Sequence, residues 1–249
     1  MNKIKVSIVS YYNTIPFLYG FSKMPNFYTQ IDLQKDVPSV CAAKLLSGEV
    51  DLGLIPVAEI PKLKNSYIIS DYCIGAEGKV DTVMLFSKVP LEEIKTILLD
   101  YQSKTSVNLV KILCSKFWKI SPVFEETSEG YENKIAGTTA AVIIGNRVFD
   151  FKDKFQYVFD LSYEWQKFTQ MPFVFACWVS NKKLTDSFIE YFNIACKIGI
   201  ENIPASIKNS GEHSLNIDLT DYLCNKIKFN FDDKKRQAVD LFLKYLNEI

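Results

Sequence analysis

Short apolar runs alternate with amphipathic stretches along the chain, and this alternation predicts an α/β fold. The runs have the length of buried strands and occupy residues 5–10, 27–33, 50–57, 66–76, 96–100, 122–127, 138–146 and 172–180. Helical patterns cover residues 36–50, 103–118 and 163–170, and the chain from about residue 185 onward also looks helical. This β-α-β order favours a mostly parallel sheet with helices on its faces.

The first of these helices carries clear start and stop signals. Pro38 stands near its beginning and Gly48 follows its last apolar residue. Proline is tolerated in the first turn, and glycine commonly ends a helix in the left-handed conformation. A helix within residues 36–50 is therefore predicted.

The order of the elements suggests two lobes and no linker between them. We expect residues 1–84 and 181–249 to form one discontinuous lobe and residues 85–180 to form the other. The chain would then cross between the lobes near residues 82–88 and 174–180. Such an arrangement leaves a ligand cleft where the carboxyl ends of the strands face each other.

Polar turns follow several of the predicted strands at this cleft. They hold nine candidate ligand-binding residues: Ser10, Asn13, Thr14, Thr82, Ser103, Thr105, Ser106, Gly145 and Asn146. Ser or Thr before a helix is most often only an N-cap, and Asn13 fits an Asx-turn equally well. The same positions, however, offer free N–H groups and a positive helix end to a carboxylate or phosphate.

The balance of charged residues limits the classes of ligand that the protein is expected to bind. Lys and Arg together number 29, as do Asp and Glu, so no net field recruits nucleic acid or an anionic membrane. Arg147 and Arg236 are the only arginines. An anionic ligand must therefore be held mostly by neutral donors rather than by guanidinium clamps.

Other reactive residue types favour structural roles. The six cysteines are spread without a CxxC pair and are expected to be buried, reduced thiols. His213 is the only histidine and is expected at the surface, which argues against zinc and against Ser-His or Cys-His catalysis. Asp51 and Asp100 could be general bases, but carboxylates at strand ends commonly cap helices or hold loops, so a structural role is expected for both.

Aromatic residues are dense between residues 160 and 178. Trp165 and Trp178 favour core positions, although this stretch has enough aromatics to form a cleft wall. At the N-terminus, a basic start and an apolar stretch resemble a signal peptide, but "YYNT" and Pro16 interrupt the stretch and no cleavage site follows. No run is long enough to span a membrane. A cytoplasmic protein is predicted.

Several stretches, taken in order, resemble the chorismate dehydratases of the futalosine route to menaquinone. They are "VSYYNTIPF", "LLSGEVDLGLIPVAEI", "SKTSVNLVKILC", "AAVIIGN" and "DLSYEWQKFTQMPFVFACWVS", within roughly residues 4 to 180. The resemblance implies a two-lobed, periplasmic-binding-protein-like type II fold used by a cytosolic enzyme. It also implies a lyase that converts chorismate to 3-[(1-carboxyvinyl)oxy]benzoate and water, with no metal, nucleotide or flavin.

The same resemblance implies roles for matched residues. Asn13 and Thr82 would be catalytic and hold the departing C4 hydroxyl of chorismate, whereas Ser103, Thr105 and Ser106 would receive a carboxylate at a helix N-terminus. The sequence departs from the family pattern at three positions. Asn146 stands where the family has Asp, Gln170 where Gly is usual, and Lys79 where Pro is common.

Three other functions remain open from the sequence. The closest is 1,4-dihydroxy-6-naphthoate synthase of the same pathway, against which "SYYNTIPF" argues. A small-carboxylate-binding protein without catalysis suits the fold but usually needs an export signal. A regulator's effector domain would need a basic helix-turn-helix segment, and none is found. The oligomeric state is not predicted.

Overall fold

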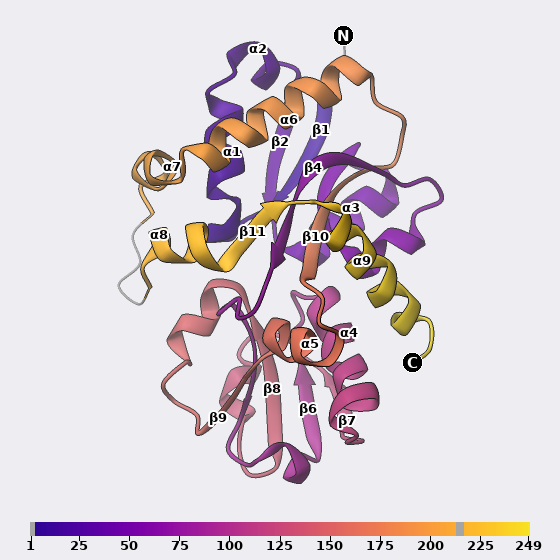
Figure 1. The fold of residues 1–249 in the computed structure, drawn as a ribbon, viewed down its shortest axis with the longest axis vertical. Helices are drawn as coiled ribbons and strands as arrows, with labels where there is room; N and C mark the ends of the chain where they lie inside the picture. The colour runs from indigo at the N-terminus through magenta and orange to yellow at the C-terminus, as the bar shows by residue number, and fades with distance from the viewer. Residues whose placement is uncertain (1–2, 213–216) are drawn as a thin grey trace.

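The computed structural model describes residues 3–212 and 217–249, which form an upper and a lower lobe, each built on its own sheet (Figure 1). The predicted surface position of His213 falls outside the described residues. Within them, no helix is long and apolar enough to cross a membrane.

The sheet of the upper lobe takes strands from both halves of the chain. Its six strands lie in the order β11 (Ile227–Asn230), β4 (Tyr67–Ala76), β10 (Phe173–Ser180), β3 (Leu52–Pro56), β1 (Ile4–Val9) and β2 (Ile31–Asp36). Strand β1 pairs in parallel with β2 and β3, whereas β10 is antiparallel to both of its neighbours.

The sheet of the lower lobe is built from the middle of the chain. Its five strands lie in the order β7 (Val123–Glu126), β6 (Thr96–Leu99), β8 (Thr139–Ile144), β5 (Val83–Ser87) and β9 (Tyr157–Asp160). Strand β5 is antiparallel to β8 and β9. The expectation of a mostly parallel sheet is therefore wrong: both sheets are mixed, because β5 and β10 enter their sheets from the opposite lobe.

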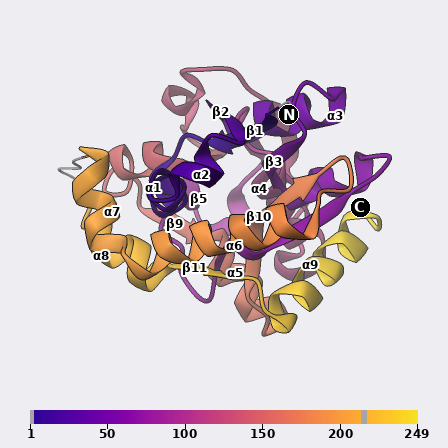
Figure 2. The same cartoon turned by 90° about the horizontal axis from the view of Figure 1, so that it is seen from above.

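Helices cover the faces of both sheets. The α-helices are α1 (Ile15–Ser22), α2 (Pro25–Tyr28), α3 (Pro38–Ser47), α4 (Thr105–Ile112), α5 (Leu161–Thr169), α6 (Asp186–Glu201), α7 (Ile203–Ser210), α8 (Leu219–Asp221) and α9 (Asp233–Leu246). The 3₁₀ helices are η1 (Tyr12–Thr14), η2 (Val57–Lys62), η3 (Leu91–Glu93), η5 (Tyr131–Lys134) and η6 (Gly145–Asp150), and η4 (Leu113–Trp118) and η7 (Tyr222–Lys226) are π-helical. Seen from above, α6 crosses the top of the upper lobe beside α1 (Figure 2).

Local signals account for several of these boundaries. Helix α3 begins at Pro38, and Gly48 ends it in the left-handed conformation with φ of 76°, as predicted. Strand β11 lies in the C-terminal part that was expected to be helical, and this expectation is wrong there. Ile227 and Phe229 are buried while Asn230 is exposed, so the segment alternates as an edge strand against β4.

Strand pairing conflicts with the predicted lobe boundary at residue 180. Residues 173–180 form β10, which hydrogen-bonds to β3 and β4 in the upper sheet rather than to any strand of the lower one. We propose that the lower lobe comprises residues 83–172, since β5 and β9 are its first and last strands.

Trp165, Trp178 and most cysteines belong to the core, as expected. Trp178 packs edge-on against Phe192 with ring centroids 4.9 Å apart, and Trp165 packs on Phe173 at 5.4 Å. All six cysteines are free thiols; five are buried, and Cys224 is the exposed exception.

The backbone conformation at Gln170 shows why the family usually has glycine at this position. It ends α5 with a left-handed backbone, φ of 58°, a conformation in which glycine avoids the steric strain of a Cβ. We expect Gln170→Gly to raise the free energy of unfolding by about 0.5–1 kcal/mol. Urea denaturation measures the change. Lys167→Gly, inside the same helix, should lower it by about 1 kcal/mol. An unchanged or lower value for Gln170→Gly would contradict the strain at this position.

Candidate active site

A cavity lies between the two sheets, lined by residues of both lobes. Its walls are largely apolar and come from both lobes, for example Val9, Ile74, Ile144, Phe175 and Ile227. Among the described residues, no Asp, Glu, Lys or Arg lines it. Six of the nine predicted residues do: Asn13, Thr82, Ser103, Thr105, Ser106 and Gly145.

Asn13 reaches the cavity from the turn between β1 and α1. Strand β1 ends at Val9, and the 3₁₀ turn η1 carries Asn13 before Pro16 helps to begin α1. The Oδ1 atom of Asn13 is buried and has no hydrogen-bond partner among the described residues. The Asx-turn alternative is therefore wrong, because that turn would use this oxygen.

A buried acceptor without a partner is unfavourable by about 1–3 kcal/mol, so such an atom calls for an explanation. The local turn does not need the Asn13 side chain. Thr14 closes it instead, since its hydroxyl donates to the carbonyls of Val9 and Tyr11 at 2.7 and 2.8 Å. Asn13 thus lines the cavity with a buried oxygen that has no hydrogen-bond partner among the described residues.

Thr82 lies at the start of the crossing from β4 to β5. The turn before it is held by Asp160, whose carboxylate accepts from the backbone N–H groups of Val80 and Asp81 at 2.8 Å each. Asp81 has a left-handed backbone with φ of 63°. Burial raises the pKa of Asp160 to about 6, although hydrogen bonds from the backbone of Asp81, Tyr163 and Val80 oppose that rise. This anchored turn fixes the side chain of Thr82 in the cavity wall.

Tyr222 is a neighbour of Thr82 that the sequence did not reveal. Its hydroxyl lies 3.1 Å from Thr82 Oγ1, across 140 residues of sequence. No signal in the sequence could have found this pair, because Tyr222 stands in a C-terminal stretch without a motif. Its buried side chain belongs to the segment between α7 and β11.

Three hydroxyl residues surround the N-terminus of α4. Ser103 Oγ accepts from the N–H of Ser106 at 3.0 Å, which is the capping role that its sequence position suggested. Thr105 Oγ1 donates to the carbonyl of Phe175 at 3.0 Å and thereby ties α4 to β10. For the Ser106 hydroxyl, the described residues provide no hydrogen-bond partner, so it is available to a ligand at this positive helix end.

Gly145 allows the two lobes to approach each other closely. It has φ of 67°, and an added Cβ would lie 2.7 Å from the ring of Tyr11. Tyr11 also hydrogen-bonds to the side chain of Gln102 in the lower lobe. The wall of the cavity is therefore closed here by a glycine that leaves room for an aromatic ring of the opposite lobe.

The other three predicted residues do not line this cavity. Ser10, Thr14 and Asn146 border a neighbouring pocket instead. Thr14 is committed to its turn, and Asn146 Oδ1 accepts from the N–H of Tyr12 at 3.4 Å. Adjacent residues of a turn point in different directions, so sequence proximity to Asn13 and Gly145 did not bring these side chains into the cavity.

The strand-end aspartates have structural roles, as expected. Asp100 accepts from the N–H of Ile144 at 2.9 Å and pairs with Arg147, which also pairs with Glu132. Asp51 accepts from the N–H of Lys5 at 2.9 Å. The side chain of Arg147 is thus occupied by two carboxylates beside the turn that carries Gly145. Of the aromatic stretch proposed as a cleft wall, Phe175 lines the cavity, whereas Trp165 and Trp178 do not.

Two lobes, each built on its own mixed sheet, give the chain a periplasmic-binding-protein-like fold. A solved structure of a Candida albicans protein with this generic fold aligns with a TM-score of 0.62 at 13% identity, over 100% of this chain and 91% of that one. A protein from Archaeoglobus fulgidus aligns with a TM-score of 0.76 at 14% identity, over 99% and 97% of the two chains.

The sequence comparison is more specific than the fold. The model of the menaquinone biosynthesis family matches residues 4–248, so this chain belongs to that family. The chain is also similar to a chorismate dehydratase from Thermus thermophilus, with 27% identity over 201 residues, which cover 74% of this chain and 72% of the relative.

Proposed function

We propose that the protein dehydrates chorismate to 3-[(1-carboxyvinyl)oxy]benzoate in menaquinone biosynthesis. Membership of that family and the similarity to a chorismate dehydratase support the proposal. The observation that carries it is the buried, unpartnered Oδ1 of Asn13, which lies in the same cavity wall as Thr82. A ligand with a hydroxyl group would satisfy this acceptor.

The reaction balances without an oxidant or reductant. A base removes the proton at C3 of the ring, the C–H electrons form the C3–C4 double bond, and the C4–O bond breaks. The departing hydroxide and the removed proton together make water. Because the product ring is aromatic, the equilibrium lies far toward product, and the protein needs only to assist proton loss and hydroxide departure.

In this proposal the cavity wall contributes hydrogen bonds and orientation rather than a charged side chain. Since no described Asp, Glu, Lys or Arg lines it, we assign proton removal to the enolpyruvyl carboxylate of the substrate itself. Asn13 and Thr82 would hold the C4 oxygen while its bond to carbon breaks. Fixed hydrogen bonds and near-attack orientation are both large catalytic terms.

The ring carboxylate would lie at the N-terminus of α4, where Ser106 has a free hydroxyl and Ser103 and Thr105 fix the helix end. The helix dipole and its N–H groups favour an anion there without arginine. The apolar walls would pack on the ring. Consistent with a biosynthetic enzyme acting on a soluble metabolite, we further propose a cytoplasmic location.

The proposal is tested by incubating the purified protein with chorismate, without added metal or cofactor, and following the products by mass and ultraviolet absorbance. We expect loss of one water and formation of the substituted benzoate. Heat-denatured protein controls for spontaneous decay of chorismate. Unchanged chorismate that raises the melting temperature would instead indicate a binding protein, and chorismate that neither reacts nor stabilises the protein would exclude it as the ligand.

A further inference from the structure

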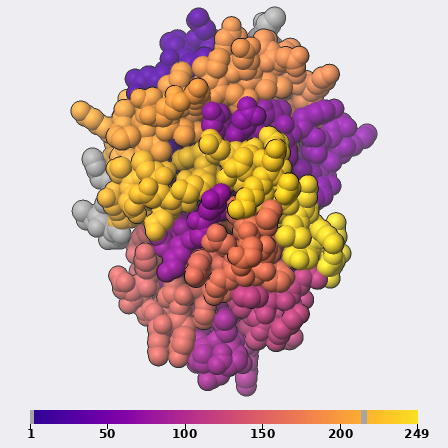
Figure 3. Space-filling view, in the orientation of Figure 1, coloured from indigo at the N-terminus to yellow at the C-terminus, as the bar shows by residue number. Residues whose placement is uncertain are grey.

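Tyr222 does not line the cavity itself, but its hydroxyl contacts Thr82, which does. It begins η7, between α8 and β11, and its ring packs edge-on against Phe149 of the lower lobe at 6.2 Å. In Figure 3 the yellow C-terminal atoms form a band across the middle of the molecule, between the orange and magenta parts. The segment that carries Tyr222 thus lies where the lobes meet.

The direction of the hydrogen bond between Thr82 and Tyr222 decides whether Thr82 can also donate to a substrate. A threonine hydroxyl has one proton to donate and can accept from other donors. Thr82 Oγ1 lies 3.1 Å from the hydroxyl of Tyr222, and either oxygen can be the donor. Its only other hydrogen bond among the described residues is a long one, in which Thr82 donates to the carbonyl of Val80 at 3.5 Å. The Thr82 proton is therefore weakly held there and can turn to a better acceptor. If Thr82 donated to Tyr222, no proton would remain for the leaving oxygen of a substrate.

We propose that Tyr222 is a positioning residue, which donates to Thr82 Oγ1 and so directs the Thr82 proton into the cavity, toward the leaving hydroxyl. This inference rests on the proposed dehydratase function. Thr82 then donates to the C4 oxygen while it accepts from Tyr222, and the two hydrogen bonds strengthen each other as negative charge develops on the leaving oxygen. Tyr222 itself does not touch the substrate.

Burial keeps the phenol of Tyr222 in its protonated form, which is able to donate a hydrogen bond. Burial raises the pKa of Tyr222 well above its usual value, although hydrogen bonds with Thr82 and Asn13 act in the opposite direction. The phenol therefore keeps its proton throughout the range in which enzymes operate. The nearby carboxylates of Asp81 and Asp160 also raise the pKa of Tyr222, so its proton is retained rather than transferred.

The first test is Tyr222→Phe, which removes only the hydroxyl. With chorismate as substrate, we expect kcat to fall about tenfold, as for loss of one hydrogen bond in a buried network, and KM to change less than threefold.

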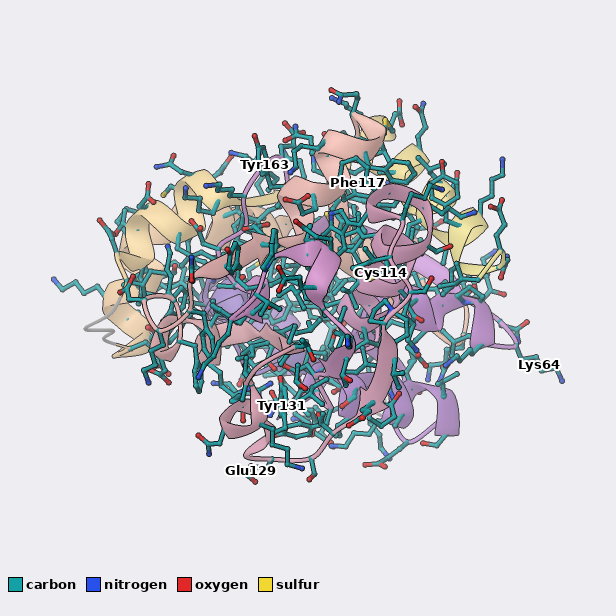
Figure 4. All side chains as sticks on the ribbon, turned by 90° about the horizontal axis from the view of Figure 1, so that it is seen from below. Lys64, Cys114, Phe117, Glu129, Tyr131 and Tyr163 are labelled. Carbon is teal, nitrogen blue, oxygen red and sulfur yellow. The ribbon has the colours of Figure 1, made fainter. Side chains whose placement is uncertain are left out.

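Tyr131→Phe is the matched control: Tyr131 is also buried, and its hydroxyl donates to the Val142 carbonyl at 2.6 Å. Figure 4 shows it in the lower lobe beside Glu129, and it does not line the cavity. Its kcat should stay within twofold of the wild type.

The second test separates action through Thr82 from a general structural effect. Thr82→Val removes the hydroxyl that Tyr222 is proposed to orient, so Tyr222→Phe should cause no further loss of kcat in the double variant. A structural role would instead multiply the two losses. In a third variant, 3-fluorotyrosine in place of Tyr222 keeps the phenol, and we expect at least half of the wild-type kcat even if Tyr222→Phe does not fold.

The outcomes are distinguishable. Normal turnover by Tyr222→Phe, multiplied losses in the double variant, or a 3-fluorotyrosine enzyme as slow as Tyr222→Phe would each overturn the role of Tyr222 while leaving the dehydratase intact. If the wild-type protein formed no product from chorismate, the proposed function would fail, and this inference with it.

Discussion

Asn13→Ala is expected to lower kcat for chorismate dehydration by about 100- to 1,000-fold, because it removes the amide whose oxygen can accept from the C4 hydroxyl and whose N–H groups can donate to the departing oxygen. Among the described residues, Asn13 Oδ1 has no hydrogen-bond partner, so it remains available to a ligand. Binding should change little, since the apolar walls and the α4 N-terminus remain. Steady-state kinetics give kcat, and thermal shift or calorimetry with the product gives the affinity.

Stability provides an independent readout for the same variant. Removing a buried oxygen that lacks a partner should leave the free energy of unfolding unchanged or raise it by about 1 kcal/mol. A group kept for structure would show the opposite change. A loss of activity together with a gain of stability would therefore identify Asn13 as a functional residue.

Asn202→Ala is the matched control. Asn202 is exposed at the end of α6, where its side chain donates to the carbonyl of Ile198 at 2.8 Å. Its loss should alter kcat by less than twofold. Near-normal turnover by Asn13→Ala with intact binding would contradict the role given to Asn13 and would shift the stabilisation of the leaving group to Thr82.

The sequence located the cavity because of a general property of α/β folds. Strand ends that face a common crevice carry the ligand-binding turns, and this was enough to find Asn13, Thr82 and Gly145 at three different strands. This property predicted which turns lie at the cavity, but not which side chains of a turn point into it. Thr14 follows Asn13 directly, yet its hydroxyl bonds to the backbone, and which of two neighbours faces a cavity depends on the geometry of η1.

The features that could not be predicted from the sequence, or were predicted wrongly, depend on contacts between distant parts of the chain. Helix α1 was not predicted, since its sequence "IPFLYGFS" is apolar on most sides and shows little periodicity. Strand β11 has only four residues and gains its identity from pairing with β4. The Tyr222–Thr82 contact joins residues 140 apart and has no local pattern. Such features depend on long-range contacts that a single sequence does not encode in any short window.

The second large effect concerns the packing of α1 against α6. The two helices touch through glycines: a Cβ on Gly199 would lie 1.7 Å from the carbonyl oxygen of Pro16, and one on Gly20 would lie 1.8 Å from that of Ala195. These atoms are backbone, so they cannot move away as a side chain would. The helices must separate to admit even one methyl group.

Gly199→Ala is therefore expected to lower the free energy of unfolding by about 3 kcal/mol or more, through overpacking of a backbone contact. Helix propensity alone predicts the opposite sign, a gain of about 1 kcal/mol for Ala over Gly. The midpoint of urea denaturation distinguishes the two. Lys197→Ala, on the exposed side of α6, should change stability by less than about 0.5 kcal/mol.

The double variant Gly20→Ala/Gly199→Ala sharpens the test. Once one methyl has separated the helices, the second meets less resistance, so the two losses should sum to clearly more than the loss in the double variant. Additive losses would mean that the glycines act at separate contacts. The same displacement bears on catalysis, because α1 begins two residues after Asn13. Folded Gly199→Ala protein should consequently show a lower kcat per active molecule, whereas Lys197→Ala should not.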